Sequence, residues 1–68
     1  MPLSARNQIP ARITAIRRGP ATANVELDAN GLRLVASITA EAADDLSLRE
    51  GQEVKAVIKA SDVMVSTD

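Results

Sequence analysis

Apolar and polar residues alternate along most of this 68-residue chain, and a period of two predicts strands that bury one face. The first strand is expected over residues 9–16, where Pro10 suits an edge position because proline has no N–H to donate. Ile16 breaks the alternation, which indicates a β-bulge or burial on both faces. The sequence Arg17-Arg18-Gly19-Pro20 then predicts a turn.

Two further strands are expected on either side of Asn30-Gly31, which is the strongest short signal for a β-hairpin. Residues 21–28 alternate before this pair, with alanine, valine and leucine on one face, and residues 32–38 alternate after it. Strands joined by a two-residue turn run antiparallel and side by side. The sequence therefore predicts that the second and third strands pair directly.

A short helix is expected over residues 40–46, because Thr39 is a suitable N-cap and Glu41 places a carboxylate in the first turn. Residues 48–51 predict the turn that follows it. The helix therefore separates the first three strands from the rest of the chain.

Residues 54–58 predict a fourth strand, and Val63 and Val65 predict the start of a short fifth strand. Together these elements predict an all-β fold, a five-stranded, OB-fold-like small barrel with one short helix between strands 3 and 4. The chain has no internal repeat, linker or low-complexity tract, so residues 1–68 are expected to form this single domain.

The chain contains no cysteine, no histidine and no aromatic residue, although 46% of it is hydrophobic. Disulfides, thiolate metal sites and the commonest general base are therefore excluded, and we expect neither an enzyme nor direct side-chain ligands to a metal. A core of small aliphatic side chains is marginal in so short a chain. We therefore expect oligomerisation to supply the missing stability.

The cell compartment is also constrained by what the sequence lacks. No apolar run approaches the roughly 20 residues that span a bilayer, and the N-terminus lacks the pattern of a signal peptide. We therefore expect a cytoplasmic protein without a membrane partner.

A single-stranded nucleic-acid-binding module is one alternative, because OB folds often bind single strands and Arg12, Arg17 and Arg18 make the first third of the chain basic. Such sites use aromatic stacking platforms, which this chain lacks, and its net charge is −1. Nucleic acid is therefore a disfavoured partner. A purely structural assembly module, which binds neither nucleic acid nor a small ligand, is a further alternative.

Hydrogen-bond donors gather at both ends of the chain. Ser4-Ala5-Arg6-Asn7-Gln8 contains a hydroxyl, a guanidinium and two amides, and Lys59-Ala60-Ser61 adds an ammonium and a second hydroxyl. If the two ends meet, they form a pocket with two fixed positive charges, which suits a small oxyanion. The same residues could instead be solvated surface groups, so composition alone leaves both interpretations open.

The residues Ser4-Ala5-Arg6-Asn7-Gln8-Ile9, together with Lys59-Ala60-Ser61-Asp62-Val63-Met64, resemble the terminal motifs of the molbindin (Mop) family, which has a single Mop or TOBE-type domain. The helix start at Ile38-Thr39 and the turn from Leu46 to Gly51 are similar to the same pattern. The resemblance covers nearly the whole chain. It implies an OB-type fold that assembles into a hexamer, a trimer of dimers.

The resemblance also implies a function, which is the reversible binding of molybdate, and of tungstate as a near-isostere, for cytoplasmic molybdenum storage. It places the oxyanion between subunits. Carried over residue by residue, the oxyanion-binding residues are Ser4, Arg6, Asn7, Lys59, Ala60 and Ser61. Ala60 would act through its backbone N–H, and Asn7 would shape the turn. The family can have a second class of anion site, for which the turn from Gly19 to Thr22 is the candidate.

Overall fold

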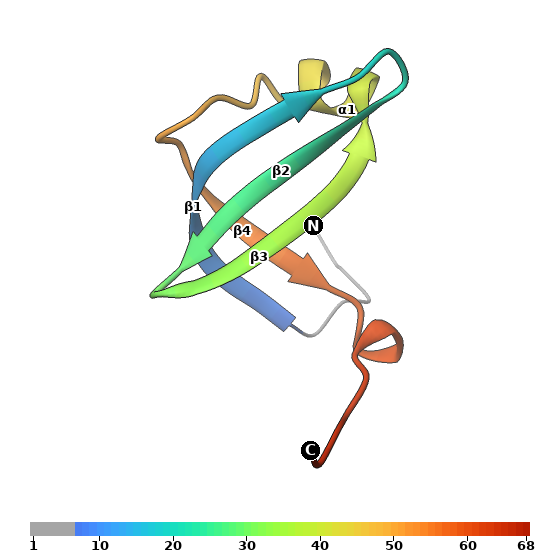
Figure 1. Ribbon diagram of the computed structural model, residues 1–68. Helices are drawn as coiled ribbons and strands as arrows, with labels where there is room; N and C mark the ends of the chain where they lie inside the picture. Colours follow the sequence, from blue (N-terminus) through green and yellow to red (C-terminus); the bar gives the residue numbers. More distant parts are fainter. Residues whose placement is uncertain (1–6) are drawn as a thin grey trace.

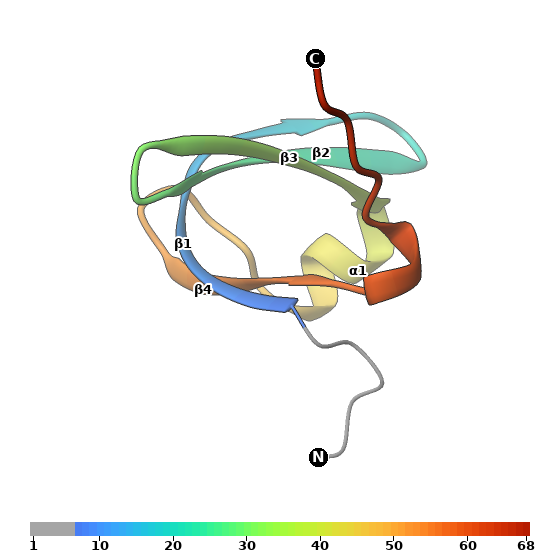
Figure 2. The same cartoon turned by 90° about the horizontal axis from the view of Figure 1, so that it is seen from below.

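Four strands, one short helix and one 3₁₀ turn make up residues 7–68, the part of the chain that the computed structural model describes. These elements are β1 (Asn7–Arg18), β2 (Thr22–Ala29), β3 (Leu32–Thr39), α1 (Ala40–Asp45), β4 (Glu53–Ile58) and the 3₁₀ turn η1 (Ala60–Asp62). The strands form one antiparallel sheet in the order β3-β2-β1-β4 (Figure 1). Figure 2 shows that the sheet curves strongly, with α1 beyond the end of β3. The expected mostly-β fold with one helix directly after the third strand is confirmed.

β1 is long because it pairs with two neighbouring strands, one after the other along its length. Its first half pairs with β4 and its second half with β2, and Arg12 pairs with both Asp28 and Glu53. Pro10 lies in the first half, where β1 pairs only with β4, so the expected edge position is confirmed. This sharing brings Arg12 beside Glu53, which follows it by 41 positions in the sequence.

A β-bulge in the middle of β1 explains the break in its alternation. The register with β2 shifts between Ile13 and Ala15, so one extra residue is accommodated there. Ile13 and, beyond the bulge, Ile16 both pack in the core, and Ile16 pairs with the buried Val25. The second half of β1 therefore still presents an apolar side chain to the core, and the bulge that Ile16 indicated is confirmed.

The hairpin between β2 and β3 turns through Asn30 and Gly31, as the sequence predicts. Both residues have positive φ, 55° and 93°, which is the backbone that matches the twist of a two-residue hairpin turn. The Gly31 N–H donates a hydrogen bond to Asp28 Oδ1 at 3.0 Å, which holds the turn. β2 and β3 consequently pair along their whole length.

α1 begins at the predicted residue and ends one residue earlier than expected. The Ala42 N–H donates a hydrogen bond to Thr39 Oγ1 at 3.0 Å, so Thr39 is the N-cap. Ala43 is fully buried, and α1 contacts β2 and β3. No helical segment in the described part of the chain has the length and apolar character needed to cross a membrane.

The core consists of small aliphatic side chains, as the composition requires. Its buried centre comes from β1, β2 and β4 and contains Ile13, Val25, Leu27 and Ala56. Partly buried apolar side chains pack around it, namely Ile9, Ala11, Ile16, Leu34, Ala36, Ile38, Leu48 and Val54. The inner face of β3 is only half buried throughout. The core is therefore thinnest where β3 and β4 face each other.

The fifth strand expected at Val63 and Val65 is wrong for the single chain. After β4 the chain makes the turn η1, which is closed by a hydrogen bond from the Asp62 N–H to the Lys59 carbonyl at 2.9 Å. Residues 63–68 then leave the sheet without regular structure (Figure 1). A strand forms only beside a partner strand, and η1 directs this segment away from the sheet. Among the described residues the sheet therefore has four strands, and β3 and β4 do not pair with each other.

Candidate functional site

Asn7 and Ile58 bring the start of β1 beside the end of β4. They are register partners in β1 and β4, and Asn7 Nδ2 donates a hydrogen bond to the Ile58 carbonyl at 3.1 Å. This bond is partly buried and joins residues 51 positions apart. The structure thus places the Asn7 amide against the residue that directly precedes Lys59. Ser4 and Arg6, the other expected site residues of the first motif, lie outside the described residues.

Lys59, Ala60 and Ser61 form the start of η1 at the end of β4. Lys59 is the N-cap of this turn, with an extended backbone (φ −63°, ψ 135°), and all three residues are exposed. The first N–H groups of a helical turn have no carbonyl partner inside the turn, so the turn itself does not engage those of Ala60 and Ser61. The Ser61 hydroxyl and the Lys59 ammonium add donors from the same short segment.

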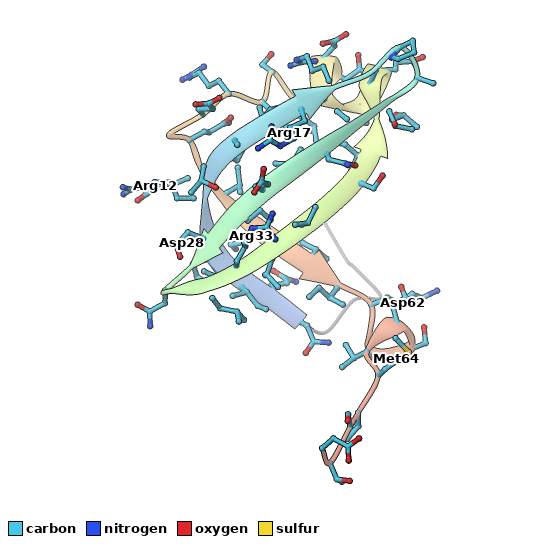
Figure 3. All side chains as sticks on the ribbon, viewed as in Figure 1. Arg12, Arg17, Asp28, Arg33, Asp62 and Met64 are labelled. Carbon is cyan, nitrogen blue, oxygen red and sulfur yellow. The ribbon has the colours of Figure 1, made fainter. Side chains whose placement is uncertain are left out.

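The charges in this segment cancel. Among residues 7–68 no ion pair involves Lys59, so its ammonium is not neutralised within this part of the chain. Asp62, however, adds one carboxylate to the same turn (Figure 3). With one cation and one acid, the segment has no net positive charge of its own. A dianion site there needs a second cation, which is the role expected for Arg6.

The chemistry of the segment suits an anion rather than a metal ion. Ammonium, hydroxyl and backbone N–H groups donate hydrogen bonds, and those assisted by charge are shorter and stronger than neutral ones. In the described range, no group of three or more His, Cys, Asp or Glu side chains is arranged to hold a metal ion. The segment can therefore direct several donors at one side of a small oxyanion.

The arginines that a nucleic-acid site would use are each paired with a carboxylate. The pairs are Arg12 with Glu53 at 3.3 Å, Arg17 with Glu26 at 3.0 Å and Arg18 with Asp44 at 2.8 Å. Because each of these three guanidinium groups lies beside an acid, the three arginines together present little net positive charge to a phosphate backbone. The geometry therefore gives no support to the nucleic-acid alternative.

A three-residue charge cluster, which no sequence pattern signals, lies on the outer face of the sheet. Glu26 on β2 accepts hydrogen bonds from Arg33 on β3 at 2.7 Å and from Arg17 on β1 at 3.0 Å (Figure 3). These bonds, first that from Arg33, lower the pKa of the Glu26 carboxyl below its ordinary value. The three residues come from three strands and meet only through the register of the sheet, so local spacing could not reveal them.

The turn from Gly19 to Thr22, the candidate for a second class of anion site, is closed by a hydrogen bond. The Gly19 N–H donates to the Thr22 carbonyl at 2.8 Å, so this donor is already engaged. Arg18, which precedes the turn, is paired with Asp44. A second anion site at this turn stays a prediction.

The chain is similar over almost its whole length to small proteins that are already known. The model of the TOBE domain matches residues 3–65. Molybdenum-pterin-binding protein 3 of Clostridium pasteurianum is 41% identical over 66 residues, which cover 96% of this chain and 97% of that protein. The similarity therefore includes both terminal motifs.

Two solved structures share the fold. The molybdate binding protein from Sporomusa ovata matches with a TM-score of 0.96 at 36% identity, over 98% of this chain and 100% of that one. MopII from Clostridium pasteurianum matches with a TM-score of 0.89 at 34% identity, over 97% of this chain and 100% of that one. The resemblance inferred from the terminal motifs is thus confirmed.

Proposed function

We propose that this chain, which belongs to the TOBE domain family, is a binding protein that reversibly holds molybdate, and tungstate as its near-isostere. Its relatives include proteins named for binding molybdenum-pterin and molybdate, and they match it almost from end to end. The proposed role is molybdenum storage and homeostasis in the cytoplasm. It is carried out by the single domain of residues 1–68 without a catalytic step.

The pairing of Asn7 with Ile58 is the observation that supports the proposal most directly. It ties Asn7, the first described residue of the first donor motif, to the strand that leads into the second motif. The proposed ligand set combines both motifs and consists of Ser4, Arg6, Lys59, Ser61 and the backbone N–H of Ala60. Asn7 acts beside this set by holding the end of β4.

Two fixed cations and several neutral donors suit a tetrahedral dianion. Molybdate keeps both negative charges at neutral pH, so its site needs donors rather than a protonated acid. Arg6 offers a planar fork of N–H groups and Lys59 a compact ammonium, and together they outweigh the carboxylate of Asp62. Sulfate has the same shape and charge, so selectivity depends on the size of the cavity. A site without covalent ligands releases the anion readily.

The proposed site lies between subunits of a homo-oligomer, a hexamer built as a trimer of dimers. In one chain Lys59, Ala60 and Ser61 are all exposed, so one copy covers only one side of an anion there. A second copy supplies the other side and excludes water, which strengthens charge-assisted hydrogen bonds. Because the anion binds only the assembled state, it also stabilises the assembly.

Isothermal titration calorimetry with molybdate, tungstate and sulfate tests the proposal, on protein whose mass in solution is known. We expect binding of the first two anions and none of sulfate. No binding of any of the three by correctly assembled protein would contradict the proposal and favour the structural assembly module. Retention of a single-stranded oligonucleotide at low salt would favour the nucleic-acid alternative instead.

Variants that remove one charge locate the site. We expect Arg6→Ala and Lys59→Ala each to weaken molybdate binding by roughly tenfold to a hundredfold, because each removes a charge-assisted hydrogen bond. The matched controls are Arg49→Ala, in the exposed turn before β4, and Lys55→Ala, on the outer face of β4. Both controls should bind as the wild-type protein does. Unchanged affinity in the two site variants would mean that the pocket is wrongly assigned.

A further inference from the structure

One carboxylate lies inside the proposed donor segment. Asp62 is the last residue of η1 and directly follows Lys59, Ala60 and Ser61. It is exposed, and Figure 3 shows it on the turn beyond the end of β4. A negative charge beside a site for a dianion opposes binding. An acid at this position therefore changes how strongly the segment holds an oxyanion.

The fold makes no use of the Asp62 carboxylate among residues 7–68. The ion pairs of this range engage other acids. Its side-chain hydrogen bonds do not include the Asp62 carboxylate either. The backbone N–H of Asp62 closes η1 by donating to the Lys59 carbonyl at 2.9 Å, and this bond does not depend on the side chain. The charge can therefore be removed without breaking the turn.

The position of Asp62 in the turn brings its carboxylate within reach of Lys59. Lys59 is the N-cap of η1, and Asp62 is the third residue after it. A carboxylate three residues after an N-cap can reach back toward the N-cap residue, and side chains three residues apart in a 3₁₀ turn lie on the same side. The Lys59 ammonium is carried on a flexible stem of four carbons. The two opposite charges can therefore meet through side-chain rotation alone.

The two charges are nevertheless not locked together. No ion pair within residues 7–68 joins Lys59 to Asp62. Both residues are exposed, and exposed side chains change rotamer on a picosecond to nanosecond timescale. An ion pair between two such side chains is also weak. The Lys59 ammonium can therefore exchange the Asp62 carboxylate for another anion at little cost.

We propose that Asp62 is the internal counter-ion of Lys59 and competes with the oxyanion for the Lys59 ammonium. When the oxyanion leaves, the carboxylate takes its place beside Lys59. When the oxyanion binds, it first displaces the carboxylate, so part of its interaction energy is spent on that exchange. Asp62 thereby lowers the affinity of the site. This role rests on the proposed function, because it regulates the oxyanion site assigned there.

Competition of this kind suits a store, which must release its anion as well as bind it. Two fixed cations in a site that excludes water hold a dianion strongly, because charge-assisted hydrogen bonds strengthen as the surroundings become less polar. Differences in affinity between related complexes appear mostly as differences in the rate of dissociation. A carboxylate that is ready to replace the anion on Lys59 therefore shortens the time for which the anion stays bound.

Asp62→Asn, which removes the charge and keeps the size of the side chain, tests the competition. Calorimetric titration with molybdate should show binding about threefold to fivefold tighter than that of the wild-type protein, because a weak ion pair no longer opposes it. Asp62→Glu keeps the charge and should bind as the wild-type protein does. Glu50→Gln removes an exposed acid from the turn before β4 and should also leave the affinity unchanged. Equal or weaker binding by Asp62→Asn would overturn the proposal.

A double-mutant cycle shows whether Asp62 acts through Lys59. In a Lys59→Gln background there is no ammonium to compete for, so adding Asp62→Asn should leave the affinity unchanged. This pair is titrated with molybdate at concentrations that saturate the weaker site, and melting temperature and mass in solution show that each variant keeps its fold and assembly. The same gain in both backgrounds would mean that Asp62 repels the anion directly, and the competition would then be wrong.

The two proposals fail in different ways. A wild-type protein that binds molybdate, with no gain in the Asp62→Asn variant, overturns the competition and leaves the proposed function intact. A correctly assembled wild-type protein that binds no oxyanion overturns the proposed function, and the role of Asp62 falls with it.

Discussion

The Asn7 amide connects the fold to the proposed site at the scale of a single residue. Its Nδ2 holds the carbonyl of Ile58, which is the last residue of β4. The next peptide begins η1, so the direction of the Lys59 segment depends on how Ile58 is held. We therefore propose that Asn7 is a positioning residue, which acts on the proposed anion site through the backbone of β4.

We expect Asn7→Asp to weaken molybdate binding by about tenfold or more, because it removes the donor and sets a carboxylate against the Ile58 carbonyl. Calorimetric titration gives the affinity, and the melting temperature shows that the fold persists. Gln8→Glu is the control, since it makes the same chemical change at the next position, where the side chain is exposed. Equal losses in the two variants would assign the effect to charge alone and contradict the positioning role.

The carboxyl group of Glu26 makes the stability of the folded chain depend on pH. Hydrogen bonds from Arg33 and Arg17 lower its pKa in the folded chain below the ordinary value of 4.5. The folded state then binds fewer protons than the unfolded state. The stabilisation is therefore fully present above the ordinary pKa and is lost as the pH falls through the lowered one.

We expect Glu26→Gln to lower the melting temperature at neutral pH and to flatten the decline of the melting temperature as the pH falls below the ordinary pKa of 4.5. Thermal unfolding followed by circular dichroism at a series of pH values measures this. The control is Glu53→Gln, because the Glu53 side chain is 81% exposed and its pair with Arg12 contributes little. The interpretation fails if the melting temperature of the Glu26→Gln variant falls as steeply with decreasing pH as that of the wild-type protein.

Among the elements, α1 depends most on a single cap. It has six residues, which is too few for a helix that is stable by itself. The Thr39 hydroxyl engages an N–H of its first turn, and Ala43 anchors the helix in the core. The cap and one buried contact therefore hold the element that closes this end of the sheet.

We expect Thr39→Ala to reduce the free energy of unfolding by about 1 kcal/mol, because it leaves an N–H of the first turn without a partner. That is a large share of the stability of a small domain. Urea unfolding at one fixed protein concentration measures the difference. Thr39→Ser keeps the oxygen that accepts this hydrogen bond, so its free energy of unfolding should fall much less. Equal destabilisation by both substitutions would assign the effect to the lost methyl group in β3.

Elements that depend on neighbouring residues could be predicted from the sequence. The Asn30-Gly31 turn, the Thr39 cap and the bulge near Ile16 all follow from local backbone preferences. The lack of a fifth strand at Val63 and Val65 could not be predicted in the same way. Alternation there indicates a segment that is able to form a strand, but it carries no information about whether a pairing edge lies within reach.

The candidate site could be predicted only where its residues are contiguous. Lys59, Ala60 and Ser61 are adjacent, so their donors are visible in the sequence. The hydrogen bond from Asn7 to the Ile58 carbonyl arises from the pairing of β1 with β4 across 51 positions, which no local pattern specifies. The charge cluster of Glu26, Arg33 and Arg17 likewise arises from the register of β1, β2 and β3.

At the scale of the whole molecule, the described residues 7–68 leave part of the core and the proposed donor segment open to solvent. An apolar groove lies open between β3 and β4, and the donor segment at η1 is exposed. If one second copy completes both, folding stability and anion affinity share a single interface. Both then rise with protein concentration, because association favours the folded state by mass action.

The division of β1 between two partners also has a consequence for how the chain folds. The pairings of β1 with β2 and of β2 with β3 join strands through short turns, so little loop entropy is lost when they form. The pairing with β4 joins residues 41 to 51 positions apart, and such distant contacts form slowly. We therefore expect the three-stranded meander to form first and β4 to dock last. A newly synthesised chain then gains its proposed anion-binding segment only in the final step of its folding.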